Sequence, residues 1–134
     1  MLFKTFLFIA LVMALSAGGL PQTVSYREIP CKTPTNEASC YWVKGRLEAY
    51  NGTPAIRLWK IGTHRLLAIS SGQDADKRDQ LDNEHLELPP NIQRRFKPFQ
   101  NRIFADFEVC PLEPERPGIM QAACIESAKN VVEK

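Results

Sequence analysis

The sequence has no excess of one charge and no hydrophobic run long enough for a membrane-spanning helix. Its 134 residues include 17 Lys and Arg against 15 Asp and Glu, which gives a formal net charge of +2. This balance excludes a histone-like nucleic-acid binder and an acidic tail protein, and a hydrophobic content of 44% excludes a fully disordered chain. A chain of this length forms one domain.

Residues typical of catalytic and metal sites are also scarce. His64 and His85 are the only histidines, no two cysteines stand in a C-x-x-C spacing, and no G-x-S-x-G motif is present. Metal sites in proteins need such clustered ligands, and serine hydrolases of the common type need that motif. The sequence therefore predicts no metal site, no cofactor and no catalytic residue.

The N-terminus has the features of a secretory signal peptide. Lys4 precedes an apolar run from Phe6 to Leu15, and small residues follow up to Gly19. The apolar run has about half of the ~20 residues that a membrane-spanning helix needs. We therefore expect residues 1–19 to be removed during export to the periplasm or the medium. The mature chain then has about 115 residues and no transmembrane segment.

All four cysteines lie in the mature part, at Cys31, Cys40, Cys110 and Cys124. An even number of cysteines in an exported chain predicts disulfides. Three pairings are possible. The pairing of Cys31 with Cys40 and of Cys110 with Cys124 is favoured because each bridge is local.

The middle of the chain predicts three strands, after an irregular segment at 20–39. Segments 41–50 and 53–61 flank Asn51-Gly52, a dipeptide typical of a two-residue hairpin turn. A reversal at Gly62-Thr63 leads into the third strand, 64–69. The tight turn predicts the cross-strand pairs Arg46 with Arg57 and Lys44 with Trp59.

Residues 70–101 interrupt the strand pattern. Segment 74–87 is rich in Asp and Glu and is expected to be a solvated loop or surface helix, whereas segment 94–102 is basic. A short helix is predicted over Asn91–Lys97, because prolines stand before and after it.

Two further strands are predicted at 102–110 and 120–132, although a terminal helix is an alternative for the second. A hairpin centred on Pro117 places Cys110 opposite Cys124, with apolar pairs on the other face. It also places Glu108 opposite Glu126, which is unfavourable unless a cation lies nearby.

The order of these elements predicts a mainly β fold. We expect residues 40–134 to form a small five-stranded antiparallel OB-fold-like barrel, with one short helix between the third and fourth strands. A different small β-barrel or a β-sandwich is the alternative.

Two blocks of the sequence resemble a known group of proteins. The blocks GRLEAYNGTPAIRLWKIGTHRLL (45–67) and DFEVCPLEPERPGIMQAACIESAKN (106–130) are similar to small exported bacterial proteins. Those proteins share a GRLxxYNGTPxxRLWxxGTxR core and a CIESAKN ending, and no activity is assigned to the group. The resemblance implies an exported bacterial protein and implies no catalytic residue.

The first predicted hairpin carries the candidate site. Alternation directs Leu47 and Ile56 toward the core and places basic and aromatic residues on the opposite face. Arginine offers a planar fork for carboxylate or phosphate, and tryptophan offers a stacking surface. The predicted site binds an anionic or glycan ligand and consists of Arg46, Arg57 and Trp59, with Lys44 and Trp42 at its edge. The alternative is that Glu48, Asp106 or the acidic segment neutralises the arginines internally.

The favoured function is therefore a non-enzymatic binding or interaction module, for which a nucleic-acid partner is not expected. One alternative is a metal-dependent hydrolase or nuclease that uses the acids of 74–87, where His85 lies near Asp82 and Glu84. The other alternative is a structural protein of the cell envelope.

Overall fold

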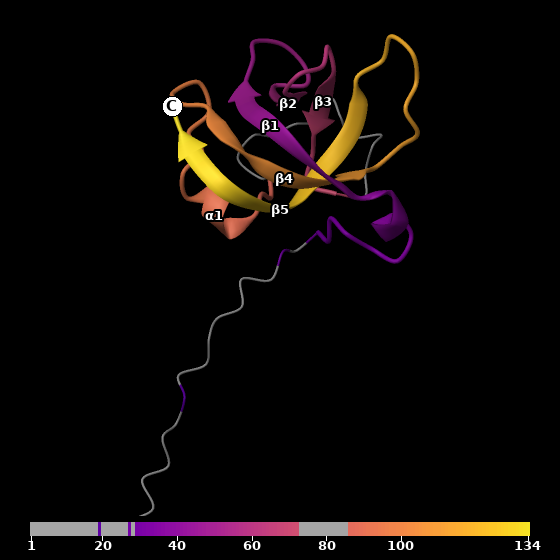
Figure 1. Cartoon of the computed structure of the whole chain (residues 1–134), viewed down its shortest axis with the longest axis horizontal. Helices are drawn as coiled ribbons and strands as arrows, with labels where there is room; N and C mark the ends of the chain where they lie inside the picture. Colours follow the sequence, from indigo (N-terminus) through magenta and orange to yellow (C-terminus); the bar gives the residue numbers. More distant parts are fainter. Residues whose placement is uncertain (1–18, 20–26, 28, 73–85) are drawn as a thin grey trace, which may run out of the picture.

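The structure is a computed structural model that describes residues 19, 27, 29–72 and 86–134. Five strands form a closed barrel in the order β1-β2-β3-β5-β4 (Figure 1). The strands are β1 (Tyr41–Ala49), β2 (Ile56–Lys60), β3 (Leu66–Ile69), β4 (Ile103–Pro111) and β5 (Gln121–Glu133). The prediction of a mainly β, five-stranded barrel is confirmed.

The barrel is mixed, so the prediction of a purely antiparallel sheet is wrong. β3 and β5 run parallel, with Leu67 opposite Gln121 and Ile69 opposite Ala123, while the other neighbouring pairs are antiparallel. The chain between them passes through β4, which pairs with β1 on the other side. β5 therefore returns along β3 in the same direction and closes the barrel.

Helical structure is shorter than predicted and begins elsewhere. The helix α1 (Pro90–Gln93) starts one residue before the predicted Asn91–Lys97 and ends early, and an unpredicted 3-10 helix, η1 (Glu37–Ser39), precedes β1. The Asn101 side chain holds the segment that follows the helix. Its oxygen accepts from the Lys97 N–H at 2.8 Å and its amide donates to the Arg95 carbonyl at 2.7 Å, which turns the chain toward β4.

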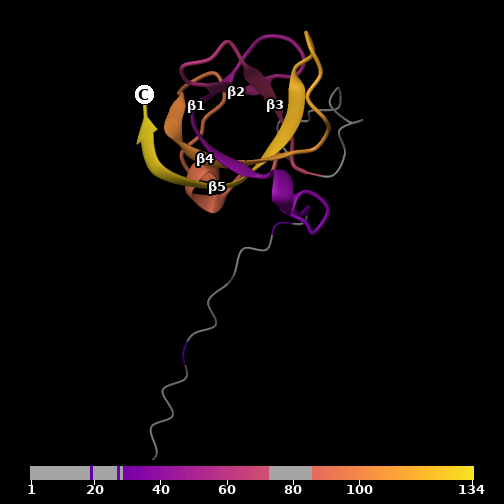
Figure 2. The same cartoon turned by 45° about the vertical axis from the view of Figure 1, so that its right-hand side comes forward.

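Alternation along β1, β2 and β4 directs apolar side chains into the barrel and their neighbours in sequence outward. In β3 and the first half of β5, successive residues are buried on both faces. Figure 2 shows the strands closing around the interior of the barrel. The largest fully buried side chains include those of Phe107, Leu47, Ile56, Leu58 and Ile103. Gly45 lies among them, where a Cβ would come within 2.6 Å of Leu58 Cδ1.

The β1–β2 hairpin is offset by two residues from its predicted register. Arg46 lies opposite Trp59 and Glu48 lies opposite Arg57. Pro54 has no N–H for a tight hairpin, and the loop instead spans residues 51–54 and is closed by the Tyr50 N–H, which donates to the Ala55 carbonyl at 2.8 Å. Because the side-chain period of a strand is two residues, the offset leaves every predicted face unchanged.

The predicted disulfide pairing is wrong, although all four cysteines form bridges. Cys31 bonds to Cys124 and Cys40 bonds to Cys110, with Cα–Cα distances of 5.6 and 4.1 Å. The segment before β1 crosses the outside of β4 and β5 and brings its two cysteines to theirs. Two such disulfides are typical of an oxidising environment outside the cytoplasm.

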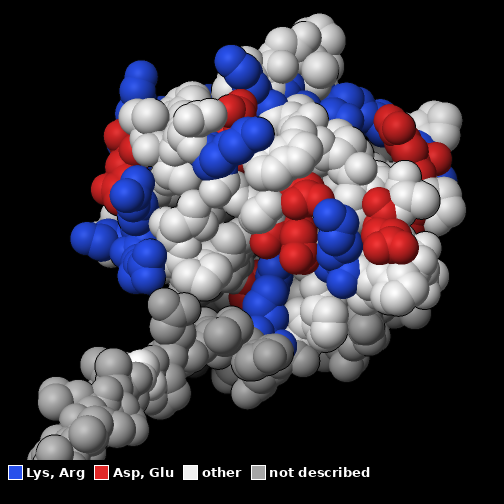
Figure 3. Space-filling model, turned by 60° about the horizontal axis from the view of Figure 1, so that its bottom comes forward, with Lys and Arg blue, Asp and Glu red and all other residues white. Residues whose placement is uncertain are grey.

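The same N-terminal segment resolves the predicted clash between acidic residues. A register shift after Glu108 places it opposite Ser127, which donates to its carboxylate at 2.8 Å. The Lys32 ammonium also binds Glu108, and the Lys32 N–H donates to Glu126 at 2.9 Å. The cation that this pair requires is therefore present. Figure 3 shows acidic and basic side chains next to one another at the centre of one face.

Two predictions concern residues that the structure largely does not describe. The signal peptide at 1–19 and most of the acidic segment 74–87 lie outside the described residues. Among the residues that are described, no helix is long and apolar enough to cross a membrane.

Candidate ligand-binding site on the outer barrel face

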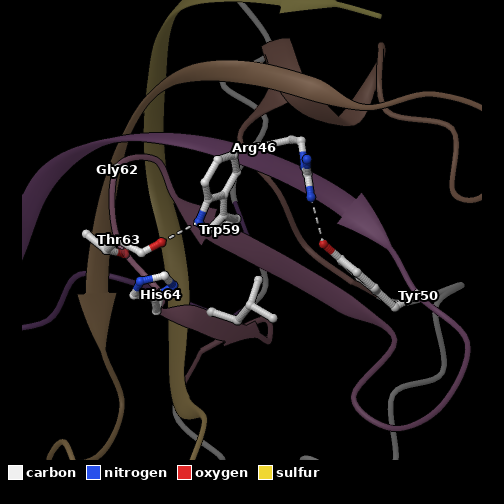
Figure 4. Close-up of a pocket in the computed structure, with 7 residues that line it drawn as sticks. Arg46, Tyr50, Trp59, Gly62, Thr63 and His64 are labelled. Atoms are coloured by element: carbon white, nitrogen blue, oxygen red, sulfur yellow. Dashed lines mark hydrogen bonds between the residues drawn. The ribbon is translucent and has the colours of Figure 1, made fainter.

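A shallow hollow lies on the outer face of β1, β2 and β3. Its volume is about 550 Å³. One row of cross-strand neighbours forms its floor, with Arg46 opposite Trp59 and Trp59 opposite Leu66. Tyr50 closes it from the β1–β2 loop and residues 62–64 close it from the β2–β3 loop (Figure 4).

Trp59 is fixed at the centre of this hollow. The Arg46 guanidinium carbon lies 5.0 Å from the centroid of its ring, which is cation–π geometry. The indole Nε1–H donates to the Thr63 carbonyl at 2.8 Å, and the dashed line in Figure 4 marks this bond. The hydrogen bond and the stacking together hold the ring in one orientation, as a stacking surface for a ligand requires.

Arg46 is positioned by two neighbours, and its Nε has no hydrogen-bond partner in the described part of the chain. Its Nη2 donates to the Tyr50 hydroxyl at 3.1 Å, and its Nε lies 3.1 Å from Glu48 Oε2. The Nε–Glu48 contact is an ion pair without hydrogen-bond geometry, because the buried Nε has no hydrogen-bond partner among the described residues. Glu48 also accepts from Arg102 Nε at 2.7 Å, so one carboxylate serves two arginines.

Arg57 lies beside the hollow and supports it. Its guanidinium stacks on the Tyr50 ring at 4.8 Å, and its Nε donates to the Pro54 carbonyl at 2.8 Å. No carboxylate of the described residues forms an ion pair with Arg57. The structure therefore assembles a ladder of Trp59, Arg46, Tyr50 and Arg57, in which cations and aromatic rings alternate.

The two predicted edge residues lie further along β1 and do not line the hollow. Lys44 is exposed and lies opposite Asp106 on β4. Trp42 is 47% exposed, and the Lys129 ammonium lies 4.2 Å from its ring centroid. Of the five predicted residues, the structure brings Arg46 and Trp59 into the hollow and Arg57 against its wall.

Sequence analysis missed the loop residues of the hollow. Tyr50 directly precedes the turn dipeptide and was counted as the end of a strand. Thr63 and His64 follow Gly62 at the second reversal, and His64 is exposed at the rim. Their proximity depends on how two loops fold over one face, so strand periodicity carries no signal for it.

The local charge of this face is positive. Arg46 and Arg102 share the Glu48 carboxylate, and Arg57 lies opposite Glu48 on β2 without an ion pair to any carboxylate of the described residues. The described residues contain no cluster of three or more His, Cys, Asp or Glu side chains that could hold a metal ion. The hydrolase hypothesis depends on His85 and the acids of 74–87, nearly all of which lie outside the described residues.

Comparison with protein-family models, with curated proteins and with solved structures finds no match for this chain. The resemblance to small exported bacterial proteins stays a prediction.

Proposed function

We propose that this protein is an exported, non-enzymatic binding module that holds an anionic ligand in the hollow of Arg46 and Trp59. An acidic glycan is the class of ligand that uses both side chains, because its carboxylates pair with arginine and its sugar rings stack on tryptophan. The observation that carries the proposal is the ion pairing of Arg46. Its only carboxylate partner in the described part of the chain is Glu48, which Arg102 shares.

The proposal includes an OB-fold-like arrangement of the barrel. OB-folds bind oligosaccharides and oligonucleotides on the face of their second and third strands and on the loop between their first and second strands. The hollow occupies that face, and Tyr50 comes from the corresponding loop. The sequential β1-β2-β3 meander and the crossover to β4 support this assignment.

Tryptophan fluorescence tests the proposal directly. The chain has two tryptophans, so a Trp42→Phe background leaves Trp59 as the only reporter. We would titrate this variant with an oligouronate, a neutral oligosaccharide of the same length and a short oligonucleotide. We expect saturable binding of the oligouronate and at least tenfold weaker binding of the neutral sugar.

A double variant identifies the site. Arg46→Ala with Arg57→Ala should abolish binding, whereas Arg116→Ala, which removes an exposed arginine paired with Glu113 on the β4–β5 loop, should leave it unchanged. Saturable binding that survives in the double variant, or no binding of any of the three probes, would refute the proposal.

A further inference from the structure

A second hollow lies where the end of β1, the loop before β4 and the end of β5 meet. Its volume is about 370 Å³, and polar groups dominate its lining. The backbones of Arg102 and Lys134 pair with each other at 2.8 and 3.0 Å, which ties the loop to the C-terminal end of β5. The lining residues are Glu48, Ala49, Phe99, Gln100, Asn101, Arg102 and Lys134.

Phe99 projects from the rim of this second hollow. Phe99 is 64% exposed, and its φ of 63° lies in the left-handed region that bulky residues rarely adopt. The loop is held in this shape by the two Asn101 hydrogen bonds to Lys97 and Arg95. The chain therefore maintains a strained backbone while the aromatic ring stays largely in solvent. Such outliers gather at ligand-binding positions.

Arg102 and Lys134 line the hollow together with this ring, and Arg94, Arg95 and Lys97 precede the ring in the chain. Arg95 and Arg102 are about half exposed, at 49% and 56% of their side chains. Their acidic partners are Glu133, at 4.0 Å from Arg95, and Glu48. The full basic set is Arg94, Arg95, Lys97, Arg102 and Lys134, and in the described part of the chain neither Arg94 nor Lys97 has an acidic partner.

The same grouping is visible on the surface. Figure 3 shows basic side chains gathered around fewer acidic ones on the side where Figure 1 places α1 and the C-terminus. Val132, at 50% exposure on the adjacent part of β5, adds a second apolar side chain. Cations around a protruding aromatic ring match a membrane surface, where anionic headgroups lie above an apolar layer.

We propose that this surface, the Phe99 surface, docks the protein on anionic phospholipid membranes. Phe99 enters the boundary between headgroups and acyl chains, and Arg102 and Lys134 bind a headgroup phosphate in the second hollow. A membrane is favoured over an acidic protein because the ring is largely exposed on a turn, from which it can enter a deformable layer without needing a matching pocket. This proposal concerns a different part of the barrel from the Trp59 hollow and does not depend on the proposed function.

Vesicle flotation with the oxidised protein tests this docking. Phosphatidylglycerol–phosphatidylcholine vesicles should bind at least tenfold more protein than pure phosphatidylcholine vesicles, and 0.5 M salt should release most of it. Equal binding to both compositions, or binding to neither, would overturn the proposal.

Phe99→Gly is the decisive variant, because glycine adopts a positive φ without strain and the fold is retained. We expect Phe99→Gly to reduce binding at least fivefold and Arg94→Ala with Lys97→Ala to reduce it similarly. The control Ile119→Ser removes another exposed apolar side chain, at 43% exposure on the β4–β5 loop, and should have no effect. Unchanged binding by Phe99→Gly would show that the ring has no role and would overturn the docking mode.

Two soluble probes test whether the partner is a small anion or an acidic protein instead of a membrane. Inorganic phosphate that binds the protein, in the absence of any vesicle binding, would indicate a small-anion site and contradict membrane docking. Polyglutamate that binds as tightly as the vesicles, with equal affinity for wild type and Phe99→Gly, would indicate an acidic protein partner and contradict it as well.

Discussion

Cys110 and Cys124 lie directly opposite each other on β4 and β5, yet each is bonded to a cysteine of the segment before β1. Cys31, Cys110 and Cys124 form one buried cluster, with Cys40 packed against it. The two bridges therefore attach the N-terminal segment across a strand pair that is already joined by its own hydrogen bonds. Their separations of 93 and 70 residues make both of them long-range restraints.

The first prediction concerns the stability that these bridges supply. The variant Cys31→Ala with Cys124→Ala should lower the free energy of unfolding by about 2–4 kcal/mol, because closing a long loop restricts the unfolded chain. Urea denaturation followed by circular dichroism measures the change, and peptide mapping of the oxidised wild type checks the pairing. A bridge between Cys31 and Cys40 in that map would contradict the structure.

The second prediction concerns acid stability. Hydrogen bonds from Lys32, which has the larger effect, and from Ser127 lower the pKa of Glu108 below its ordinary value of 4.5. Glu108 therefore stabilises the fold fully above pH 4.5, and this contribution is lost as the pH falls through the lowered pKa of the folded state. Urea midpoints measured from pH 6 down to pH 2 should fall less steeply for Glu108→Gln than for wild type.

The stability that Lys32, the partner of Glu108, contributes depends on pH in the opposite direction. The same hydrogen bond raises the pKa of Lys32 above 10.5. The stability that Lys32 contributes is therefore complete below pH 10.5 and is lost as the pH rises through the raised value.

Glu115→Gln, which removes an exposed partner of Arg65, is the matched control for Glu108→Gln. Identical acid profiles of wild type and Glu108→Gln would show that this ion pair does not contribute.

The third prediction concerns the packing of β1 against β2 and β4. A Cβ on Gly45 would lie 2.6 Å from Leu58 Cδ1 and 3.0 Å from Phe107 Cδ2. Gly45→Ala should therefore cost about 1–3 kcal/mol of unfolding free energy through overpacking. Leu58→Val in the same chain should restore part of the loss, because it withdraws the atom that the new methyl group meets. A double variant less stable than either single variant would contradict this geometry.

Alternation predicted the faces of the strands, and it also placed Arg46 and Trp59 on the outside. A register error of two residues in the first hairpin left those faces correct, which shows why side-chain direction is easier to predict than pairing. The disulfide pairing could not be predicted from the sequence, because it depends on a proline-containing segment that crosses β4 and β5 and has no periodic pattern. Tyr50 and His64 were missed for a similar reason, since loop conformation brings them to the hollow.

The alternation of residues also does not predict the parallel pairing of β3 with β5. It joins Leu67–Ile69 to Gln121–Ala123, two short stretches whose own residues do not indicate the direction of their neighbour. Barrel closure determines this pairing, and closure is a property of all five strands together.

The last prediction concerns Glu48, which stands between the two hollows. Its Oε2 lies 3.1 Å from Arg46 and its Oε1 lies 2.7 Å from Arg102, so it partly neutralises the arginine that the proposed ligand would bind. Glu48→Gln keeps the size of the side chain and removes the charge. We expect its affinity for an oligouronate to rise about fivefold, which corresponds to about 1 kcal/mol, a value typical of a partly exposed charge pair.

Fluorescence titration in the Trp42→Phe background measures this change at low and high salt, and the gain should shrink as salt screens the charges. Glu133→Gln removes a carboxylate that pairs with Arg95 and does not line the Trp59 hollow, and it should leave the affinity unchanged. Weaker binding by Glu48→Gln would mean that the carboxylate holds Arg46 in place for the ligand, so that its positioning effect exceeds its neutralising effect.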